Sequence, residues 1–296
     1  MVKVPVFSGS CTAIVTPFSE TGVDYERLKK NIDFQYENGS SALVVCGTTG
    51  EAATLSENEQ EELLRVSVRH NAGRMKIIAG IGCNDTVKAL HRAENARFAG
   101  ADAVLMVTPY YNKSTQKGLI EHFTYVADRV DIPMILYNVP SRTGIGIEAQ
   151  TYKTLSEHPN INGVKEASGN IAAAAQVRSL CGDELYIWSG NDSDTVPLMS
   201  LGALGVISVA GNILPAVVAK LCTLCLDGDF KSATELYGKY AALFSALFIE
   251  TNPIPIKTAM QLLDMDSGIM RLPLTNIGED NKAILRSVMR DTGLNV

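Results

Sequence analysis

Little in this sequence would bind a nucleic acid, an anionic lipid or a metal ion. The chain has 26 Lys and Arg against 32 Asp and Glu, and its net charge of −6 makes a poor surface for phosphate backbones or anionic membranes. Its four histidines show neither H-E-x-x-H nor another ligand spacing. We therefore expect no nucleic-acid partner, no membrane partner and no metal.

Long apolar runs and an export signal are also missing. No run approaches the roughly 20 residues of a membrane-spanning helix. The opening segment, MVKVPVFSGS, lacks the charged, apolar and small-residue zones of a signal peptide. The expected location is the cytoplasm, where the six cysteines would be reduced thiols. Cys222 and Cys225 have C-x-x-C spacing, but without a second pair we expect a buried helix face there, and neither zinc nor redox chemistry.

What the sequence does contain is a regular alternation. Its 296 residues are 46% hydrophobic and fit either two domains or one barrel. Up to about residue 212, short apolar runs alternate with segments of helical period. We predict strands in eight runs: 11–18, 41–50, 75–82, 103–110, 134–140, 161–168, 185–192 and 205–212.

These runs are nearly continuous Val, Ile, Leu and Ala, which is typical of parallel strands covered by helices on both faces. The sequence therefore predicts a (β/α)8 barrel. The main rival is a doubly wound sheet, but no G-x-G-x-x-G follows the first predicted strand.

Helical segments continue after the alternation stops. A typical barrel helix is SENEQEELLRVSVRHNAG, which opens with a serine N-cap and early glutamates and closes at Gly73. Further helices are expected at 214–227, 230–248, 253–265 and 278–291. We therefore predict a catalytic barrel of residues 1–212 and a C-terminal helical region of residues 213–296 packed on it.

The ends of the predicted strands supply a set of candidate site residues, because the carboxyl ends of barrel strands surround one cavity. They deliver the loop GTTGE (47–51), Tyr110 and Tyr111, Tyr137, Lys165, Gly190, and then Ile207 and Gly211. Backbone N–H groups and hydroxyls in GTTGE suit a small carboxylate.

Lys165 is the candidate nucleophile of this set. Alone, a lysine at a strand end would be a solvated charge. Among apolar walls, however, a neutral amine can attack a ketone and form a Schiff base. Tyr137 and Thr49 are candidate proton carriers for that step.

Four motifs in order, GTTGE at 47–51, YYNK at 110–113, YNVPSRTG at 137–144 and GVKEASG at 163–169, give the chain a resemblance to a known family. Over its whole length the chain resembles the dihydrodipicolinate synthase family of pyruvate-dependent class I aldolases. The resemblance implies that Lys165 forms an imine with pyruvate, so that no other cofactor is needed.

The resemblance also implies roles for the remaining site residues. Thr48 and Thr49 would receive the carboxylate of pyruvate. Tyr137, Thr49 and Tyr111 would form a proton relay, with Tyr111 entering the site of a neighbouring subunit, so a homodimer or homotetramer is expected. Arg142 would hold the carboxylate of the second substrate. Gly190 and Ile207 would line the pyruvate pocket with their backbone.

Arg142 is the residue that discriminates between substrates. Its planar fork can hold a carboxylate bidentately, as L-aspartate 4-semialdehyde requires. We therefore expect condensation of pyruvate with this aldehyde to 4-hydroxy-tetrahydrodipicolinate, a step towards diaminopimelate and lysine. The alternatives are a related lyase acting on a 2-keto-3-deoxy sugar acid or sialic acid, and a non-catalytic sensor of keto acids.

Feedback inhibition by lysine is the point on which this chain departs from part of the family. Many members bind lysine in a cleft at the dimer interface, and the matching positions here are Ala53, Glu57, Asn84, Lys88 and Tyr110. Lysine-sensitive members typically have a glutamate where this chain has Lys88. Because the charge is reversed, we expect insensitivity to lysine.

Overall fold

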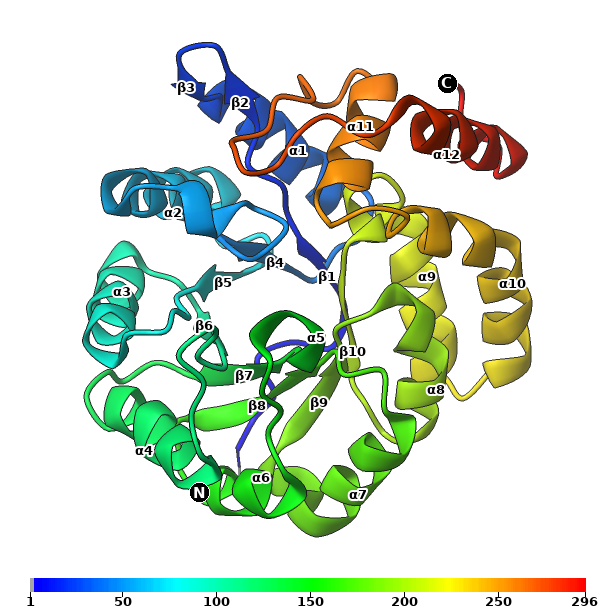
Figure 1. Cartoon of the computed structure of the whole chain (residues 1–296). Coiled ribbons are helices and arrows are strands. Elements are labelled where there is room, and N and C mark those ends of the chain that lie inside the picture. Colours follow the sequence, from blue (N-terminus) through cyan, green and yellow to red (C-terminus); the bar gives the residue numbers. More distant parts are fainter. Residues whose placement is uncertain (1–2) are drawn as a thin grey trace.

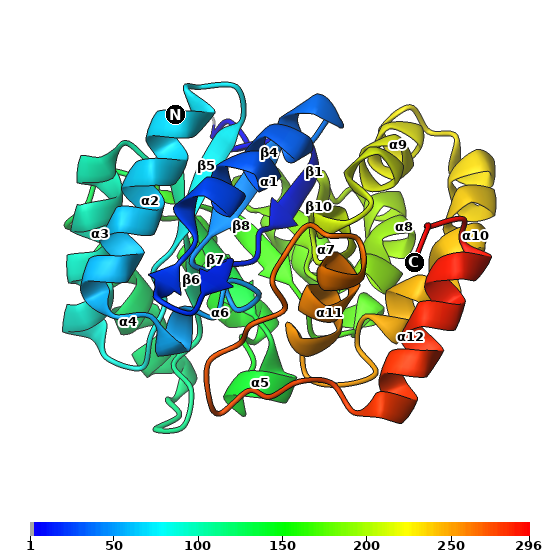
Figure 2. The same ribbon diagram turned by 90° about the horizontal axis from the view of Figure 1, so that it is seen from above.

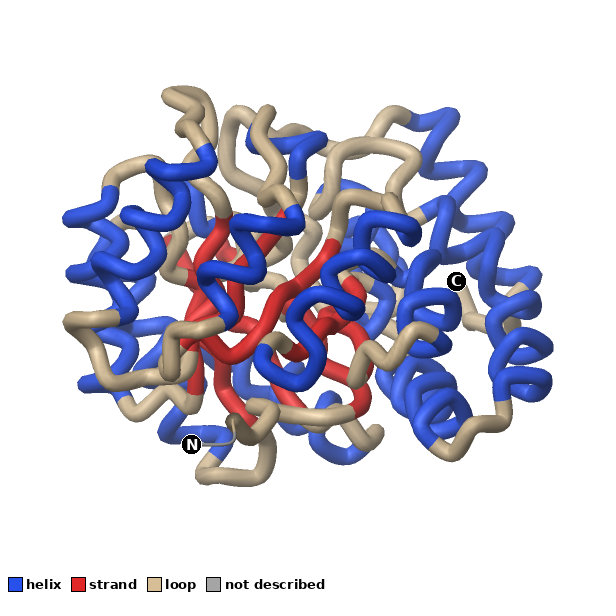
Figure 3. Tube along the Cα trace, turned by 90° about the horizontal axis from the view of Figure 1, so that it is seen from below, coloured by secondary structure: helices blue, strands red, loops and turns tan. Residues whose placement is uncertain are grey.

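A closed parallel barrel forms the centre of the molecule in the computed structural model, which describes residues 3–296. Within these residues, eight strands follow the order β1-β10-β9-β8-β7-β6-β5-β4, and β4 pairs again with β1. Figure 1 shows the helices around the strands, and Figure 3 shows the strands enclosed by helices from another side. The predicted barrel is confirmed, and the doubly wound sheet is excluded.

The barrel strands overlap the eight predicted runs, but they are shorter. The predicted runs extend past the strand ends because the rim residues that follow, such as Ile14 and Val15, are also apolar and buried. The chain turns there, and Cys46 adopts a left-handed φ of 57° directly after a strand. The barrel strands are β1 Gly9–Ala13, β4 Ala42–Val45, β5 Lys76–Gly80, β6 Ala103–Val107, β7 Met134–Asn138, β8 Ile161–Glu166, β9 Tyr186–Ser189 and β10 Gly205–Ser208. A hairpin of β2 Phe18–Ser19 and β3 Gly22–Val23 lies outside the barrel.

The five helices whose positions were predicted begin and end within a few residues of those positions, with α2 as the clearest case. Ser56 caps α2 by accepting a hydrogen bond from the Glu59 N–H, and the Glu59 carboxylate accepts one from the Ser56 N–H. The α-helices are α1 Tyr25–Glu37, α2 Glu57–Asn71, α3 Thr86–Ala99, α4 Gln116–Ala127, α5 Pro140–Thr143, α6 Ala149–Ser156, α7 Ile171–Cys181, α8 Thr195–Ser200, α9 Pro215–Leu226, α10 Phe230–Ala246, α11 Ile254–Leu262 and α12 Glu279–Asp291. The 3-10 helices are η1 Ala52–Thr54, η2 Gly182–Glu184, η3 Asp192–Asp194 and η4 Ala210–Asn212.

The two ends of the barrel are filled differently. At the amino ends of the strands, Phe7 stacks on the fully buried Trp188 with ring centroids 4.9 Å apart. Lys3 closes this end further by donating hydrogen bonds to the carbonyls of Ile161 and Glu184, each at 2.8 Å. The opposite end, where the strands finish, is surrounded by loops and carries the candidate site residues.

The four predicted C-terminal helices are confirmed as α9 to α12. Helix α9 packs against β1, α10 packs against α9, and α12 contacts α10 and α11. Figures 1 and 2 show the segment between α11 and α12 passing beside the β2–β3 hairpin, where Ser267 donates a hydrogen bond of 2.6 Å to the Phe18 carbonyl. The division of the chain at residues 212 and 213 stays a prediction.

The cysteines are all free and buried, and they include Cys222 and Cys225 on α9. Burial raises the pKa of the Cys225 thiol to about 11, which disfavours the thiolate that metal binding and redox exchange require. Among residues 3–296, no helix has the length and apolar character needed to cross a membrane.

Candidate active site

Lys165 lies inside the barrel near the end of β8. In register it faces Tyr137 on β7 and Trp188 on β9, and both of these rings belong to the apolar cluster inside the barrel. Its side chain is 5% exposed, and its Nζ lies 4.4 Å from the centroid of the Tyr137 ring. Alternation along the strand sends the next residue, Glu166, outward, where it accepts a hydrogen bond from Tyr152 on α6.

The Lys165 amine has neither an ion-pair partner nor a hydrogen-bond partner within residues 3–296. Buried charged groups in proteins are normally paired and hydrogen-bonded. Lys257 is the counter-example in the same molecule, because its Nζ lies 2.8 Å from a carboxylate oxygen of Glu51 and also donates to two carbonyls. An unpaired buried amine beside a phenol is available for chemistry.

Gly190 lies directly against the stem of this lysine. It follows β9, and its N–H donates a hydrogen bond of 2.7 Å to the Glu166 carbonyl. A Cβ at position 190 would lie 2.5 Å from the Cβ of Ala167 and 3.1 Å from Cγ of Lys165. Only glycine leaves room here, so this wall of the site consists of backbone. Ile207, the other predicted wall residue, is fully buried on β10 in the same inner cluster as Tyr137.

The threonine loop, residues 47–51, turns sharply between β4 and η1. The N–H of Gly50 donates to the carbonyl of Gly47, and the N–H of Glu51 donates to the carbonyl of Thr48, both at 3.1 Å. Thr48 is exposed, whereas Thr49 is 2% exposed. Within the described residues, no direct hydrogen bond joins the Tyr137 hydroxyl to either threonine. The structure thus brings the loop to the rim but does not form the predicted relay by direct contacts.

Two predicted site residues, Tyr111 and Arg142, have exposed side chains, whereas Lys165 is buried. Tyr111 adopts a left-handed φ of 69° and is 92% exposed, so its ring does not enter the barrel of its own chain. Arg142 is exposed on α5, and its guanidinium donates a hydrogen bond of 3.3 Å to the backbone carbonyl of Asn252.

Asn252 is a residue that the sequence analysis missed. It is 5% exposed in the connection between α10 and α11, and its amide donates a hydrogen bond of 3.0 Å to the Thr49 hydroxyl. It therefore contacts both Thr49 and Arg142. An Asn-Pro dipeptide such as 252–253 is typical of a turn, but no pattern in the sequence places that turn at the barrel rim.

Asp192 is the second missed residue. Its carboxylate is buried next to the ends of β9 and β10, where it accepts hydrogen bonds from the Ser208 hydroxyl and from the N–H groups of Val209 and Ala210. Burial raises the pKa of Asp192, although these hydrogen bonds and the nearby charge of Lys165 act in the opposite direction. Among residues 3–296, no group of three or more His, Cys, Asp or Glu side chains is placed to hold a metal ion.

A closed parallel barrel with an unpaired lysine at a strand end, a phenol against its amine and a hydroxyl-rich loop at the rim defines an enzyme of the class I aldolase type. Residues 6–292 match the model of the dihydrodipicolinate synthetase family. The chain belongs to this family and is a lyase.

Individual relatives agree with this assignment. The chain is 49% identical over 292 residues to the 4-hydroxy-tetrahydrodipicolinate synthase of Thermoanaerobacter sp. (strain X514), and 98% of each chain is covered. A crystal structure of dihydrodipicolinate synthase from Aquifex aeolicus is 47% identical with a TM-score of 0.96, covering 97% of this chain and 99% of that one. A structure described as a monomeric dihydrodipicolinate synthase variant is 39% identical with a TM-score of 0.96, covering 98% of both chains.

Proposed function

We propose that the protein condenses pyruvate with L-aspartate 4-semialdehyde to give 4-hydroxy-tetrahydrodipicolinate through an imine on Lys165. The observation that carries this proposal is the buried, unpaired amine of Lys165 against the Tyr137 ring. The relatives' name supports the same reaction. It would be a biosynthetic step on the way to diaminopimelate and lysine, carried out in the cytoplasm.

The proposed reaction begins at the Lys165 amine. Its nitrogen attacks the ketone carbon of pyruvate, a C–N bond forms, and the former carbonyl oxygen leaves as water. Loss of a proton from the methyl carbon gives an enamine, whose carbon then forms the new C–C bond to the aldehyde, and the aldehyde oxygen becomes a hydroxyl. The amino group of the aldehyde substrate then attacks the imine carbon, which closes the ring, breaks the bond to Lys165 and releases its amine. Tyr137 lies beside the amine and is the proposed proton donor to the departing oxygen. The covalent imine serves as the electron sink, so the reaction needs no other cofactor.

The threonine loop is the proposed site for the carboxylate of pyruvate, through Thr48, Thr49 and backbone N–H groups. The relay prediction names Thr49 beside Tyr137 and Tyr111. Thr49 is buried and accepts a hydrogen bond from Asn252, whereas Thr48 is the exposed hydroxyl at the rim. Separate Thr48→Val and Thr49→Val variants assign the roles: loss of the relay hydroxyl lowers kcat, and loss of a carboxylate ligand mainly raises KM for pyruvate.

Borohydride trapping tests the imine. Reduction in the presence of pyruvate should add one three-carbon acid per chain, located by peptide mass spectrometry at Lys165. Lys257 is the matched internal control, because it is also buried and its amine is fully hydrogen-bonded. An unmodified Lys165 in active enzyme contradicts the mechanism. Turnover with sugar aldehydes but not with aspartate semialdehyde would instead identify a lyase for sugar acids.

We also propose that the active form is at least a homodimer. The exposed Tyr111 can complete the relay only in the barrel of another chain. The left-handed backbone conformation of Tyr111 is costly for a residue with a side chain. Such a cost supports a functional reason for holding this side chain out from the surface.

The last part of the proposal is insensitivity to lysine, and the surroundings of Glu57 support it. Arg92 donates two hydrogen bonds to this carboxylate, at 2.8 and 3.1 Å, and Lys88 lies 3.1 Å from it. These hydrogen bonds, chiefly that of Arg92, lower the pKa of Glu57 and keep it ionised. Lys88 thus lies beside another of the predicted cleft positions, and the one carboxylate at these positions already has two cations.

An incoming ammonium group would meet Lys88 without a free carboxylate. Two like charges about 4 Å apart repel by about 1 kcal/mol in water and about 4 kcal/mol at an effective dielectric of 20. We expect no inhibition at millimolar lysine, and we expect Lys88→Glu to create sensitivity. Lys117→Glu, an exposed change on α4, is the control. Half-inhibition of the unmodified enzyme below about 1 mM lysine, an affinity of roughly 4 kcal/mol, contradicts the proposal.

A further inference from the structure

An ion pair buried behind the threonine loop joins it to the C-terminal helices. The side chains of Glu51 and Lys257 are both 0% exposed, and their charged atoms lie 2.8 Å apart. The Lys257 amine also donates to the carbonyls of Thr16 at 3.0 Å and Ile269 at 2.6 Å. All three ammonium hydrogens are thus used, and none is left for substrate.

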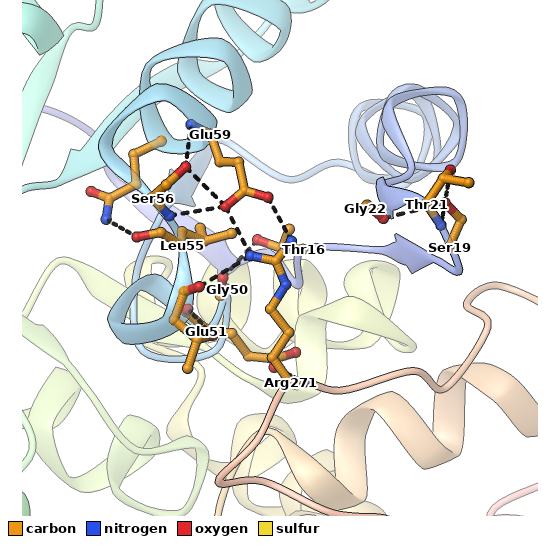
Figure 4. Close-up of polar contacts among 12 residues, drawn as sticks. Thr16, Ser19, Thr21, Gly22, Gly50, Glu51, Leu55, Ser56, Glu59 and Arg271 are labelled. Atoms are coloured by element: carbon orange, nitrogen blue, oxygen red, sulfur yellow. Dashed lines mark hydrogen bonds and ion pairs between the residues drawn. The ribbon is translucent and has the colours of Figure 1, made fainter.

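The pair acts on a strained part of the loop. Glu51 has a left-handed backbone, with φ 55° and ψ 34°, which a residue with a side chain rarely adopts. Its second carboxylate oxygen accepts a hydrogen bond of 3.1 Å from the Arg271 N–H, so both oxygens are fixed. Figure 4 shows Arg271 reaching from the C-terminal segment to Glu51 and Glu59.

The loop is held at neighbouring residues as well. The Thr16 hydroxyl donates a hydrogen bond of 2.6 Å to the Gly50 carbonyl, and Asn252 donates to the Thr49 hydroxyl at 3.0 Å. Three residues of one C-terminal segment, Asn252, Lys257 and Arg271, therefore contact a five-residue loop that lies about 200 positions earlier in the chain.

A buried ion pair is a poor means of adding stability, because an apolar pair of the same shape is often at least as stable. A buried ion pair can, however, hold its surroundings in one conformation, because any conformation that separates the two charges would leave each of them buried without a partner. A loop that contains Gly47 and Gly50 has several conformations open to it when it is not held. Its two threonines must, however, present their hydroxyls and N–H groups in one geometry to bind a carboxylate.

We propose that the Glu51–Lys257 pair is a positioning device, by which the C-terminal region sets the threonine loop in its pyruvate-binding conformation. The inference rests on the proposed function, because it takes the loop to be the carboxylate site. Loosening the pair should weaken pyruvate binding while leaving the chemistry at Lys165 intact.

The test measures the pyruvate concentration that gives half-maximal borohydride trapping, together with the melting temperature. Lys257→Met removes one charge, and the double variant Glu51→Gln with Lys257→Met removes both while keeping the side-chain volumes. In both variants, we expect half-maximal trapping to require at least about 10-fold more pyruvate than in the unmodified enzyme. Lys165 should still be fully modified at saturating pyruvate. If Lys257→Met does not fold, the double variant alone provides the test.

Leu285→Ala is the matched control for lost stability. Leu285 is fully buried on α12, and among the described residues the hydrogen bonds from other segments to the loop come from Thr16, Asn252, Lys257 and Arg271, which lie outside this helix. The Leu285→Ala variant should therefore melt earlier but keep half-maximal trapping within about twofold of the unmodified enzyme. An equal change in Leu285→Ala and in the pair variants, or unchanged trapping in the pair variants, overturns the inference.

Thr49→Val separates this inference from the proposed function. If it weakens trapping and the pair variants do not, only the positioning role fails. If Thr48→Val and Thr49→Val both leave trapping unchanged, the threonine hydroxyls do not bind the carboxylate, and the proposed carboxylate site and the positioning role fail together.

Discussion

Replacing Gly190 by alanine should displace the lysine of the proposed imine. The new Cβ would lie 2.5 Å from the Cβ of Ala167, 3.0 Å from the carbonyl oxygen of Glu166 and 3.1 Å from Cγ of Lys165. Comfortable contacts between carbon atoms are about 3.5–4.0 Å, so the overlap with Ala167 is about 1 Å. The first two neighbours cannot rotate away. Either the chain after β9 moves outward, or Lys165 leaves its position over the Tyr137 ring.

The size of the effect follows from these two responses. Overpacking of this kind costs about 1–3 kcal/mol of folding free energy, so the melting temperature should fall by several degrees. Moving a reacting atom by about 1 Å can cost on the order of 100-fold in rate. We therefore expect imine formation with pyruvate to slow by about 10- to 100-fold.

The assay follows imine formation in a single turnover by quenching with borohydride, with melting measured in parallel. Gly238→Ala is the matched control, since apart from the backbone of its own helix no heavy atom of the described residues lies within 4 Å of a Cβ at this position on α10. Alanine is favoured there by about 1 kcal/mol. It should be active and at least as stable as the unmodified enzyme. Unchanged imine formation in Gly190→Ala would refute the close packing of Gly190 on Lys165 as a catalytic constraint.

Two other changes test the second substrate and the subunit arrangement. Arg142→Ala removes a charge-assisted pair worth about 1.5–3 kcal/mol, so kcat/KM for aspartate semialdehyde should fall about 10- to 200-fold. Trapping of pyruvate should be retained. An equal loss of trapping would mean that Arg142 has a general structural role. Mixing inactive Tyr111→Phe with inactive Lys165→Ala should restore part of the activity, because a mixed dimer contains one site with both groups intact. Full activity of a species that sedimentation shows to be monomeric would contradict this arrangement, and the monomeric variant in the family makes that measurement necessary.

The barrel was predictable because its strands are buried on both faces and therefore read as continuous apolar runs. The order of the strands around the barrel, more than any single motif, predicts where the candidate site lies. Once the strands were in order, the ends of β7, β8 and β9 had to meet, and with them Tyr137, Lys165 and Gly190. Strand ends were less predictable, because the rim residues that follow are as apolar and buried as the strands.

Asn252, Lys257 and Arg271 could not be placed from the sequence. Each lies in a helical or turn segment, and no local pattern says which residue of a C-terminal helix folds back to a loop some 200 positions earlier. The left-handed conformation of Glu51 was hidden for the same reason, since glutamate gives no local signal for it. These contacts depend on how the C-terminal segment packs on the barrel, which only the folded chain specifies.

The two buried lysines show what distinguishes a reactive amine from a structural one. Lys165 and Lys257 are both enclosed, and each Nζ lies 4.4 Å from an aromatic ring centroid, Tyr137 for the first and Phe18 for the second. Burial and ring contact therefore do not separate them. Partners do: Lys257 has a carboxylate and two carbonyls, whereas Lys165 has none within the described residues. A nucleophile needs a free nitrogen lone pair, and an ammonium with all three hydrogens bonded cannot readily provide one. The borohydride experiment should therefore label the first lysine and spare the second in the same molecule.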